Sequence, residues 1–367
     1  MRSNLKYFLI FLLVAFIGFV LWYFKSIIAY IIISSVLSLI GRPLIDLLGK
    51  VRIRNIKIPR PISALITLLA IWLLIFAFFR IFIPLLAYEA KDLSNINVEK
   101  ISESLDEPLQ EIEVFFNKYD LGETDEQSLE DYISQKIVSI LNYSTLTNAF
   151  GSIASLLGNI FIAFFSISFI TFFFLKDSSL LYNGIMMFVP EKQEEQVSHI
   201  LTSIKKLLMR YFIGILIQIT LIMSLNVFGH TMVGVGFNHA MIIGLFAGLF
   251  NVIPYIGPIL GTSVGLLIGL ATHLNLEFYS ELLPMLLYML AVFLSVQALD
   301  NFIFQPVIFS NSVKAHPLEI FLVILAAGYM VGVVGMILAI PAYTVIRVIA
   351  KEFFHNYKLV KKLTDKI

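Results

Sequence analysis

Four polar residues in and just after an apolar run at 282–299 are the strongest candidates for chemistry in this sequence. They are Gln297, Asp300, Asn301 and Gln305. An ionised side chain at the centre of a bilayer costs about 2.5–3.5 kcal/mol on insertion scales, so it usually faces a cavity or a partner. Asp300 is the only acid among the four and lies far from any basic cluster. It is therefore the candidate for binding a proton or a sodium ion. The alternative is that Asp300 lies at the membrane interface.

Two clusters of glycine and proline interrupt the apolar C-terminal part of the chain, at 251–261 and at 328–341. Their members are Pro254, Gly257, Pro258, Gly328, Gly332, Gly335 and Pro341. Proline removes a backbone donor, and glycine adopts unusual dihedral angles without steric cost. Broken backbone is tolerated in hydrocarbon only where protein or a water-filled cavity satisfies it. Paired interruptions therefore predict a transport site made of discontinuous helices, and two kinked but continuous helices are the alternative.

We expect the tips of these breaks, Pro254–Pro258 and Gly332–Gly335, to meet near the midplane beside the four polar residues. Helices that start at Gly257 and Gly335 would present free N–H groups and partial positive charge to an anionic or polyhydroxylated solute. Three more side chains could fix the orientation of that solute by hydrogen bonds: Asn251, Tyr255 and Asn301.

A stripe of glycines follows the first break. Gly257, Gly261, Gly265 and Gly269 lie four residues apart, and Gly328 and Gly332 repeat that spacing at the second break. Small residues at this spacing let two helices approach closely in a membrane. The pattern predicts tight helix packing. A surface along which the helices slide past each other is a further possibility that the spacing does not require.

The composition indicates an integral membrane protein. Hydrophobic residues make up 59% of the 367 residues, against roughly 45–50% in soluble domains. Charged residues make up only 14%, and a soluble fold could not hide that much apolar surface. A net charge of +1 argues against a nucleic-acid partner. The absence of cysteine excludes disulfides and thiolate metal sites, and we expect neither a metal nor a cofactor.

Enzyme motifs fail on their context. Gly261–Gly265 matches the pattern of a nucleophile elbow, but no strand precedes it and no acid pairs with the nearby His273. The chain also has no P-loop, so we expect neither catalysis nor ATP-driven transport by this chain alone.

The apolar runs predict an all-α polytopic membrane protein with about six to eight transmembrane helices. Runs at 5–24, 27–40, 62–86 and 152–175 fit the first four spans, and 211–346 is almost continuously apolar. The fold would include two broken or re-entrant helical hairpins and a small extracytoplasmic helical insertion. Eight spans, or six spans plus two hairpins, both return the C-terminus to the side of the N-terminus.

The distribution of Lys and Arg orients the spans. Segments 41–60 and 347–367 carry six basic residues each, whereas 87–148 holds four lysines and fourteen acids. The positive-inside rule places both termini in the cytoplasm and 87–148 outside. The loop 273–281 has no Lys or Arg, so it fits the outside, as the hairpin arrangement requires. That arrangement makes 204–272 and 283–350 inverted halves.

These patterns divide the chain into five parts. They are 1–86, N-terminal membrane helices that form a scaffold; 87–148, the helical insertion; 149–210, the fourth membrane helix and a cytoplasmic linker; 211–350, the transport core; and 351–367, a basic cytoplasmic tail. The insertion either caps its own membrane domain or docks a partner or a second subunit.

Several stretches resemble the autoinducer-2 exporter family of bacterial membrane proteins. They are FFFLKD at 172–177, NVIPYIGPILG at 251–261, Gln305-Pro306 followed by His316-Pro317, and the run from Gly328 to Pro341. The resemblance covers nearly the whole chain. It departs at Ser310 and Lys314, where the family pattern has glycines. Gly261, Gly265, Pro306, His316, Pro317, Gly328 and Pro341 are the expected structural or hinge positions.

The resemblance implies a secondary transporter or exporter of the bacterial plasma membrane that assembles as a homo-oligomeric ring, such as a pentamer. The family name refers to a small signalling molecule, whereas other members resemble sodium/proton antiporters. We expect alternating access, in which the glycine-striped hairpin moves against the scaffold. A channel, or a non-transporting scaffold that recruits partners through 87–148, remains a rival interpretation.

Overall fold

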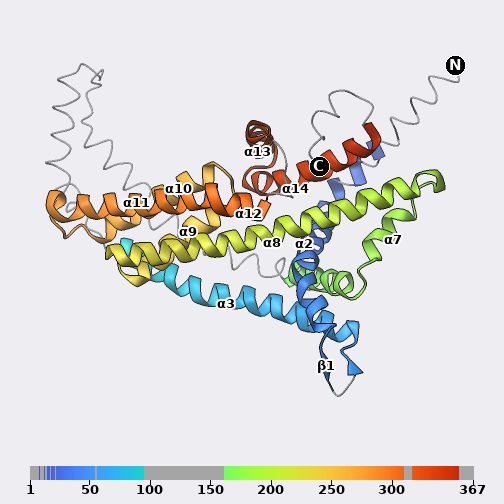
Figure 1. Ribbon diagram of the computed structural model, residues 1–367, viewed down its shortest axis with the longest axis horizontal. Helices are drawn as coiled ribbons and strands as arrows, with labels where there is room; N and C mark the ends of the chain where they lie inside the picture. The colour runs from blue at the N-terminus through green and yellow to red at the C-terminus, as the bar shows by residue number, and fades with distance from the viewer. Residues whose placement is uncertain are drawn as a thin grey trace. The chain divides into compact units, whose positions relative to one another are not determined.

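The computed structural model describes residues 22–53, 56–94, 161–309 and 316–354, with a few helical residues between 8 and 20. The insertion from residue 95 onward, the loop with Ser310 and Lys314, and the basic tail lie outside the described residues. The helices are α2 (Lys25–Leu48), α3 (Arg60–Ser94), α7 (Leu180–Met186), α8 (Glu194–Val233), α9 (Phe237–Phe250), α10 (Ile256–Thr272), α11 (Leu283–Leu299), α12 (Gln305–Phe309), α13 (Pro317–Val331) and α14 (Val333–Phe354) (Figure 1). A further helix spans Phe161–Lys176.

Five of the described helical segments are long and apolar enough to cross a membrane, and a bent pair makes a possible sixth. The five are Lys25–Leu48, Arg60–Tyr88, Glu191–Val233, Phe278–Val307 and Val333–Phe353. The bent pair joins Phe161–Lys176 to Leu180–Met186 at an angle of 87°. The prediction of an all-α polytopic membrane protein is confirmed. A short antiparallel ribbon in the basic loop, β1 (Arg52–Ile53) with β2 (Ile56–Lys57), is a small addition to it.

The chain divides into two units. The first unit comprises residues 1–76 and 154–212. In its described part, a small core of Ile45, Ala64, Leu68 and Leu175 joins α2, α3 and the helix Phe161–Lys176. At the end of that helix, Asp177 accepts hydrogen bonds from the Ser179 hydroxyl at 2.7 Å and from its backbone N–H at 3.0 Å. These two bonds lower the pKa of the exposed Asp177 carboxyl and stabilise the turn into α7.

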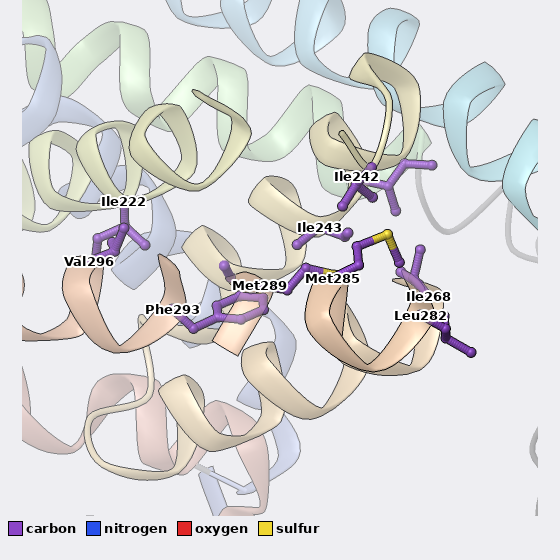
Figure 2. Packing of buried hydrophobic residues seen from close by; sticks show 11 residues of the cluster. Ile222, Ile242, Ile243, Ile268, Leu282, Met285, Met289, Phe293 and Val296 are labelled. Atoms are coloured by element: carbon purple, nitrogen blue, oxygen red, sulfur yellow. The ribbon is translucent and has the colours of Figure 1, made fainter. Parts of the chain in front are cut away.

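The second unit comprises residues 77–153 and 213–367 and contains the helices from α9 onward. Its core is formed by buried apolar side chains of α8 to α11 and the segments next to them: Ile222, Val235, Ile242, Ile243, Ala247, Ile268, Leu282, Met285, Met289, Phe293 and Val296. Figure 2 shows Ile222 of α8 beside Val296 of α11, and Ile243 of α9 near Phe293 and Met289. Apolar side chains thus hold α8, α9, α10 and α11 together.

Both predicted breaks are present as helix ends. Residues 251–255 separate α9 from α10, and Gly332 alone separates α13 from α14. Helices α9, α10 and α13 have 14, 17 and 15 residues, fewer than the roughly 20 that a transmembrane span needs. Helix α14, with 22 residues, is long enough to cross alone. The helices beside the two breaks therefore differ: both helices at the first break are short, whereas the second break joins a short helix to a long one.

The glycine stripe of α10 lies at close helix contacts. A Cβ at Gly261 would come within 3.0 Å of the Ala247 Cα on α9, and one at Gly257 would overlap the Phe250 carbonyl oxygen. Farther along α10, Gly265 and Gly269 face Phe293 and Met289 of α11. This is the close packing that the spacing predicts. Gly328 likewise faces Met336 across the second hairpin, and Pro341 is buried within α14.

The His316-Pro317 pair begins α13. The His316 Nδ1 accepts a hydrogen bond from the Leu318 N–H at 3.2 Å, and Glu319 accepts one from the His316 N–H at 3.3 Å. His316 and Glu319 thus form a capping box, and Pro317 occupies the first helical position. Pro306 lies on the exposed surface of the short helix α12.

Candidate functional site

The candidate site centres on a carboxyl group inside a transmembrane segment. Asp300 has no solvent-exposed surface and starts a π-helical turn, Asp300–Phe304, within the span Phe278–Val307. A π-helical turn adds a residue to the helix and shifts the side chains that follow, and such turns are frequent at functional sites. Here the turn places Asp300 on the buried side and Asn301 on the exposed side.

Three amide side chains from different elements donate hydrogen bonds to the Asp300 carboxyl group. Gln218 of α8 donates to Oδ1 at 2.7 Å, and Gln305 of α12 donates to Oδ2 at 2.9 Å. Asn251, at the end of α9, donates to Oδ2 at 3.4 Å. All these partners, taken from the described residues, are uncharged. The site therefore satisfies the carboxyl group without a basic side chain.

Amide groups continue this network toward the exposed surface of the second unit. Gln297 donates to the Asn301 Oδ1 at 3.0 Å, and Gln305 donates to the same oxygen at 3.2 Å. Asn301 and Gln305 are exposed, whereas Gln218 is 5% exposed. The network thus runs from a buried carboxyl group to accessible amides. Among the described residues, no group of three His, Asp or Glu could hold a metal ion.

The first break lies next to this carboxyl group. Asn251 ends α9, and Tyr255 precedes α10 with a φ of +68°, which L-residues other than glycine rarely adopt. The half-exposed Tyr255 ring packs edge-on against Phe321 of α13, with 5.6 Å between the ring centroids. Strained backbone of this kind persists only where its surroundings hold it in place. The break therefore contacts both the Asp300 network and α13.

The expected N–H donors of the first break are already in use. The N–H of Gly257 donates to the Ile253 carbonyl oxygen and that of Ile256 to the Pro254 carbonyl oxygen, both at 2.8 Å. Helix α10 begins at Ile256, one residue before the predicted start. The prediction of a free N–H at Gly257 is therefore wrong, because the turn through Pro254 closes its own hydrogen bonds. Pro258 follows within the first turn of α10, half-buried.

Among the described residues, the hydrogen-bond donors to Asp300 come from α8, the first break and α12, and not from the second break. Tyr329 and Met330 are 96% and 80% exposed, and Gly332 at the tip is exposed with a φ of +70°. Gly335 is buried within the hairpin itself, where a Cβ would overlap the Ala327 carbonyl oxygen. Within the described part of the chain, the two tips do not meet. Helix α13 reaches the first break through the contact of Phe321 with Tyr255.

The sequence of the whole chain agrees with this architecture. A model of the family described as AI-2E family transporter matches residues 9–355. The chain belongs to the AI-2E transporter family. This assignment confirms the resemblance inferred from the motifs, and together with the apolar helices it makes the chain an integral membrane transporter or permease.

Relatives of this AI-2E family member are named as transport proteins or permeases. The chain is 25% identical over 346 residues to "Putative transport protein YueF" of Bacillus subtilis, covering 91% of this chain and 85% of the relative. It is 28% identical over 210 residues to "Putative transport protein YrrI" of the same organism, covering 57% and 56%. It is also 42% identical to "Putative permease PerM" of Escherichia coli K12 over 59 residues, covering 16% and 17%.

Three buried polar residues on α8 were missed by sequence reasoning. Gln218, Asn226 and His230 are 5%, 1% and 0% exposed and follow one another along the helix at spacings of eight and four residues. Gln218 is a direct partner of Asp300, and the His230 ring lies 4.5 Å from that of Phe293 on α11. The signal was present in the sequence as polar residues inside an apolar run, but the residues that stood out were those beside the first break and the run at 282–299.

Proposed function

We propose that this AI-2E family member is a secondary transporter of the bacterial plasma membrane, with Asp300 as the binding point of the coupling ion. The observation that carries the proposal is the full burial of this carboxyl group in a span, with amides as its partners. Ionisable groups placed inside a membrane segment are costly and usually mark ion or substrate pathways. A proton or a sodium ion would supply the positive charge that the amides lack.

The origin of the three amides supports a link between ion binding and movement. They come from α8, from the first break and from α12, so an ion that displaces one of them changes a contact between elements. The Asn251 contact at 3.4 Å is the longest of the three and therefore the weakest. Release of Asn251 would free the first break while Gln218 keeps Asp300 on α8. Alternating access requires such a discontinuous element beside the bound ion.

The transported solute defines two versions of this proposal. One is a small signalling molecule of the autoinducer-2 type, exported against its gradient. The other is sodium/proton antiport, which is favoured by the closed, fully buried position of Asp300, since a site of this kind suits an ion better than a larger solute. Both versions place the termini in the cytoplasm and the 87–148 insertion outside, and both are compatible with a homo-oligomeric ring.

The test is flux into proteoliposomes that contain the purified full chain. Autoinducer-2-type solutes and sodium are supplied in turn, under imposed sodium and proton gradients. Asp300→Asn should abolish gradient-driven flux while expression and assembly stay intact. Glu281→Gln is the matched control, because Glu281 is an exposed acid in the same span. Normal transport by Asp300→Asn, with unchanged pH and sodium dependence, would refute the role of Asp300. Flux that neither saturates nor couples to a gradient would indicate a channel.

A further inference from the structure

Helix α13 begins with a histidine as its N-cap. The ring atom Nδ1 of His316 accepts a hydrogen bond from the Leu318 N–H at 3.2 Å. Most N-caps are Ser, Thr, Asp or Asn, whose side-chain oxygens accept such a bond throughout the range near neutral pH. An imidazole nitrogen differs, because it accepts only while it carries no proton. The cap of α13 therefore depends on the protonation state of one ring.

The bond to Leu318 also assigns the tautomer of the neutral His316 ring. A backbone N–H can only donate, so Nδ1 carries the lone pair and the ring hydrogen is on Nε2. A proton taken up by this ring adds to the lone pair that holds the Leu318 N–H. His316 is exposed, so water can supply that proton. Protonation and capping thus exclude each other at a single atom.

A carboxylate on the same helical turn provides a countercharge for the protonated ring. Glu319 accepts a hydrogen bond from the His316 backbone N–H at 3.3 Å through Oε2, and its Oε1 has no hydrogen-bond partner among the described residues. Arg347 of α14 carries a charge that interacts with that of Glu319. The elements packed on α13 carry these further titratable groups in their described parts: Tyr343, Lys351 and Glu352 of α14, and Tyr255 at the first break.

Loss of the cap acts on the part of α13 that precedes its contact with the first break. Without the His316 acceptor, the Leu318 N–H of the first turn loses its partner. A positive charge at a helix N-terminus is also disfavoured by the helix dipole. Phe321 follows in the second turn and packs edge-on against Tyr255, with 5.6 Å between the ring centroids. The capped turn therefore lies directly before the residue that joins α13 to the break.

We propose that His316 is a pH-sensitive cap, which holds the first turn of α13 while its ring is neutral and releases that turn when the ring takes up a proton. The step adds one proton from water to Nδ1 and breaks one hydrogen bond, the one from the Leu318 N–H. Histidine changes its charge between about pH 5 and 8. Helix α13 is therefore capped at the upper end of this range and uncapped at the lower end.

The use of this cap in transport rests on the proposed function. Phe321 of α13 contacts Tyr255 of the first break, and Asn251 of the same break donates to the Asp300 carboxyl group. Release of the first turn of α13 would weaken one support of the strained Tyr255 backbone. Acidification on the side of the membrane to which His316 is exposed would therefore act on the break beside the proposed ion site.

Amide hydrogen exchange of the full chain in nanodiscs measures the cap directly. The quantity is the protection of the Leu318 N–H relative to an unstructured peptide at the same pH, which removes the intrinsic pH dependence of exchange. Protection should fall about two- to thirtyfold from about pH 8 to about pH 5, which corresponds to the loss of one N-cap. His316→Asn should keep the protection at both pH values, because the asparagine oxygen accepts at either. His316→Ala should show low protection at both.

An exposed histidine elsewhere in the chain is the matched control. His199 lies on the first part of α8, and His199→Asn should leave the pH-dependent loss of Leu318 protection as in the wild type. NMR with 15N-labelled histidine checks the chemistry of the ring. At about pH 8, the signal that disappears in His316→Asn should be that of an Nδ1 without a proton.

Two results would overturn the proposal. The first is a wild-type Leu318 protection that does not change between the two pH values; the second is a pH-dependent loss that persists in His316→Asn. Neither result depends on flux. If Asp300→Asn transports normally while the Leu318 protection falls with pH, the role of Asp300 fails and the cap stands. In the reverse case the Asp300 proposal stands alone. If His316→Ala does not fold, the comparison of the wild type with His316→Asn still decides.

Discussion

Replacing Gly265 with alanine should destabilise the second unit, because the position has no room for a methyl group. An added Cβ would overlap the Phe293 Cζ, lie 2.9 Å from Cε2 of the same ring and lie 3.1 Å from the Ile243 Cγ2. The Phe293 ring is 6% exposed and is held on another side by His230. It cannot turn away without disturbing that contact. Overpacking of this kind costs about 1–3 kcal/mol.

A smaller opposing effect must be subtracted from that cost. Alanine favours a helix over glycine by roughly 0.5–1 kcal/mol. The expected net loss is therefore about 1–2 kcal/mol of unfolding free energy. Gly184→Ala is the matched control, because a Cβ at this helical glycine would meet nothing within 4 Å. The control should show no loss, and the difference between the two variants isolates the steric term.

A second substitution tests whether the ring of Phe293 is the cause. Phe293→Leu removes the overlapping ring atoms, so the double variant should be more stable than the sum of the single losses predicts, by about 0.5–3 kcal/mol. Equilibrium unfolding in mixed micelles, followed by circular dichroism, measures all four proteins. The reasoning is refuted if Gly265→Ala matches the wild-type stability, or if the two losses simply add. Either outcome would mean that α10 and α11 do not pack through this contact.

Two further predictions concern the first break and the loop after it. Tyr255→Gly and Tyr255→Ala both lose the Phe321 ring contact, but only glycine relieves the φ of +68°. The glycine variant should therefore be the more stable by about 1 kcal/mol, and equal unfolding midpoints would argue against backbone strain. A cysteine introduced at the exposed Asn275 should react with an impermeant maleimide in intact spheroplasts. Labelling only after lysis would exclude the re-entrant arrangement of α9 and α10.

Much of the fold could be predicted from the apolar runs, because a bilayer allows little besides helices of sufficient length. The run at 27–40 lies within α2, and that at 62–86 lies within α3. The boundary expected between the linker and the transport core at residue 210 lies inside one helix, Glu194–Val233. It lies close to residue 212, where the first unit ends. The segment 194–210 includes many good helix formers and no proline, so nothing ends the helix there.

The candidate site was predictable only in part. Asp300, Asn251 and Gln305 stood out because they are polar residues beside an apolar run or a break. Gln218 did not, since its bond to Asp300 joins positions 82 residues apart in the sequence. The π-helical turn also escaped prediction, because its hydrogen-bond pattern depends on packing and leaves no residue signature. The prediction of a free N–H at Gly257 was wrong for a local reason, because the turn through Pro254 lets this N–H bond to the Ile253 carbonyl oxygen.

The glycine contacts indicate which movement could link two polar sites on α8. The first is Gln218 with its partner Asp300, and the second is the buried pair Asn226 and His230. A Cβ at Gly244 would lie 2.7 Å from the Met223 carbonyl oxygen, and one at Gly248 would lie 3.0 Å from that of Ile219. Helix α9 therefore packs on the part of α8 that separates Gln218 from His230. The same hairpin carries Asn251, which bonds to Asp300, and Gly265, which adjoins the Phe293 ring beside His230.

A displacement of the α9–α10 hairpin along α8 would consequently change both polar sites at once. At one end it would lengthen the Asn251 bond to Asp300, which at 3.4 Å is already the longest in that network. At the other end it would move Gly265 relative to the Phe293 ring and so change the apolar surroundings of His230. The glycines at these contacts let the backbones of α8 and α9 approach closely, and the Val227 side chain against Gly244 would have to adjust during such a movement. Ion occupancy at Asp300 would then be coupled to the packing around His230 through the α9–α10 hairpin rather than through direct contact.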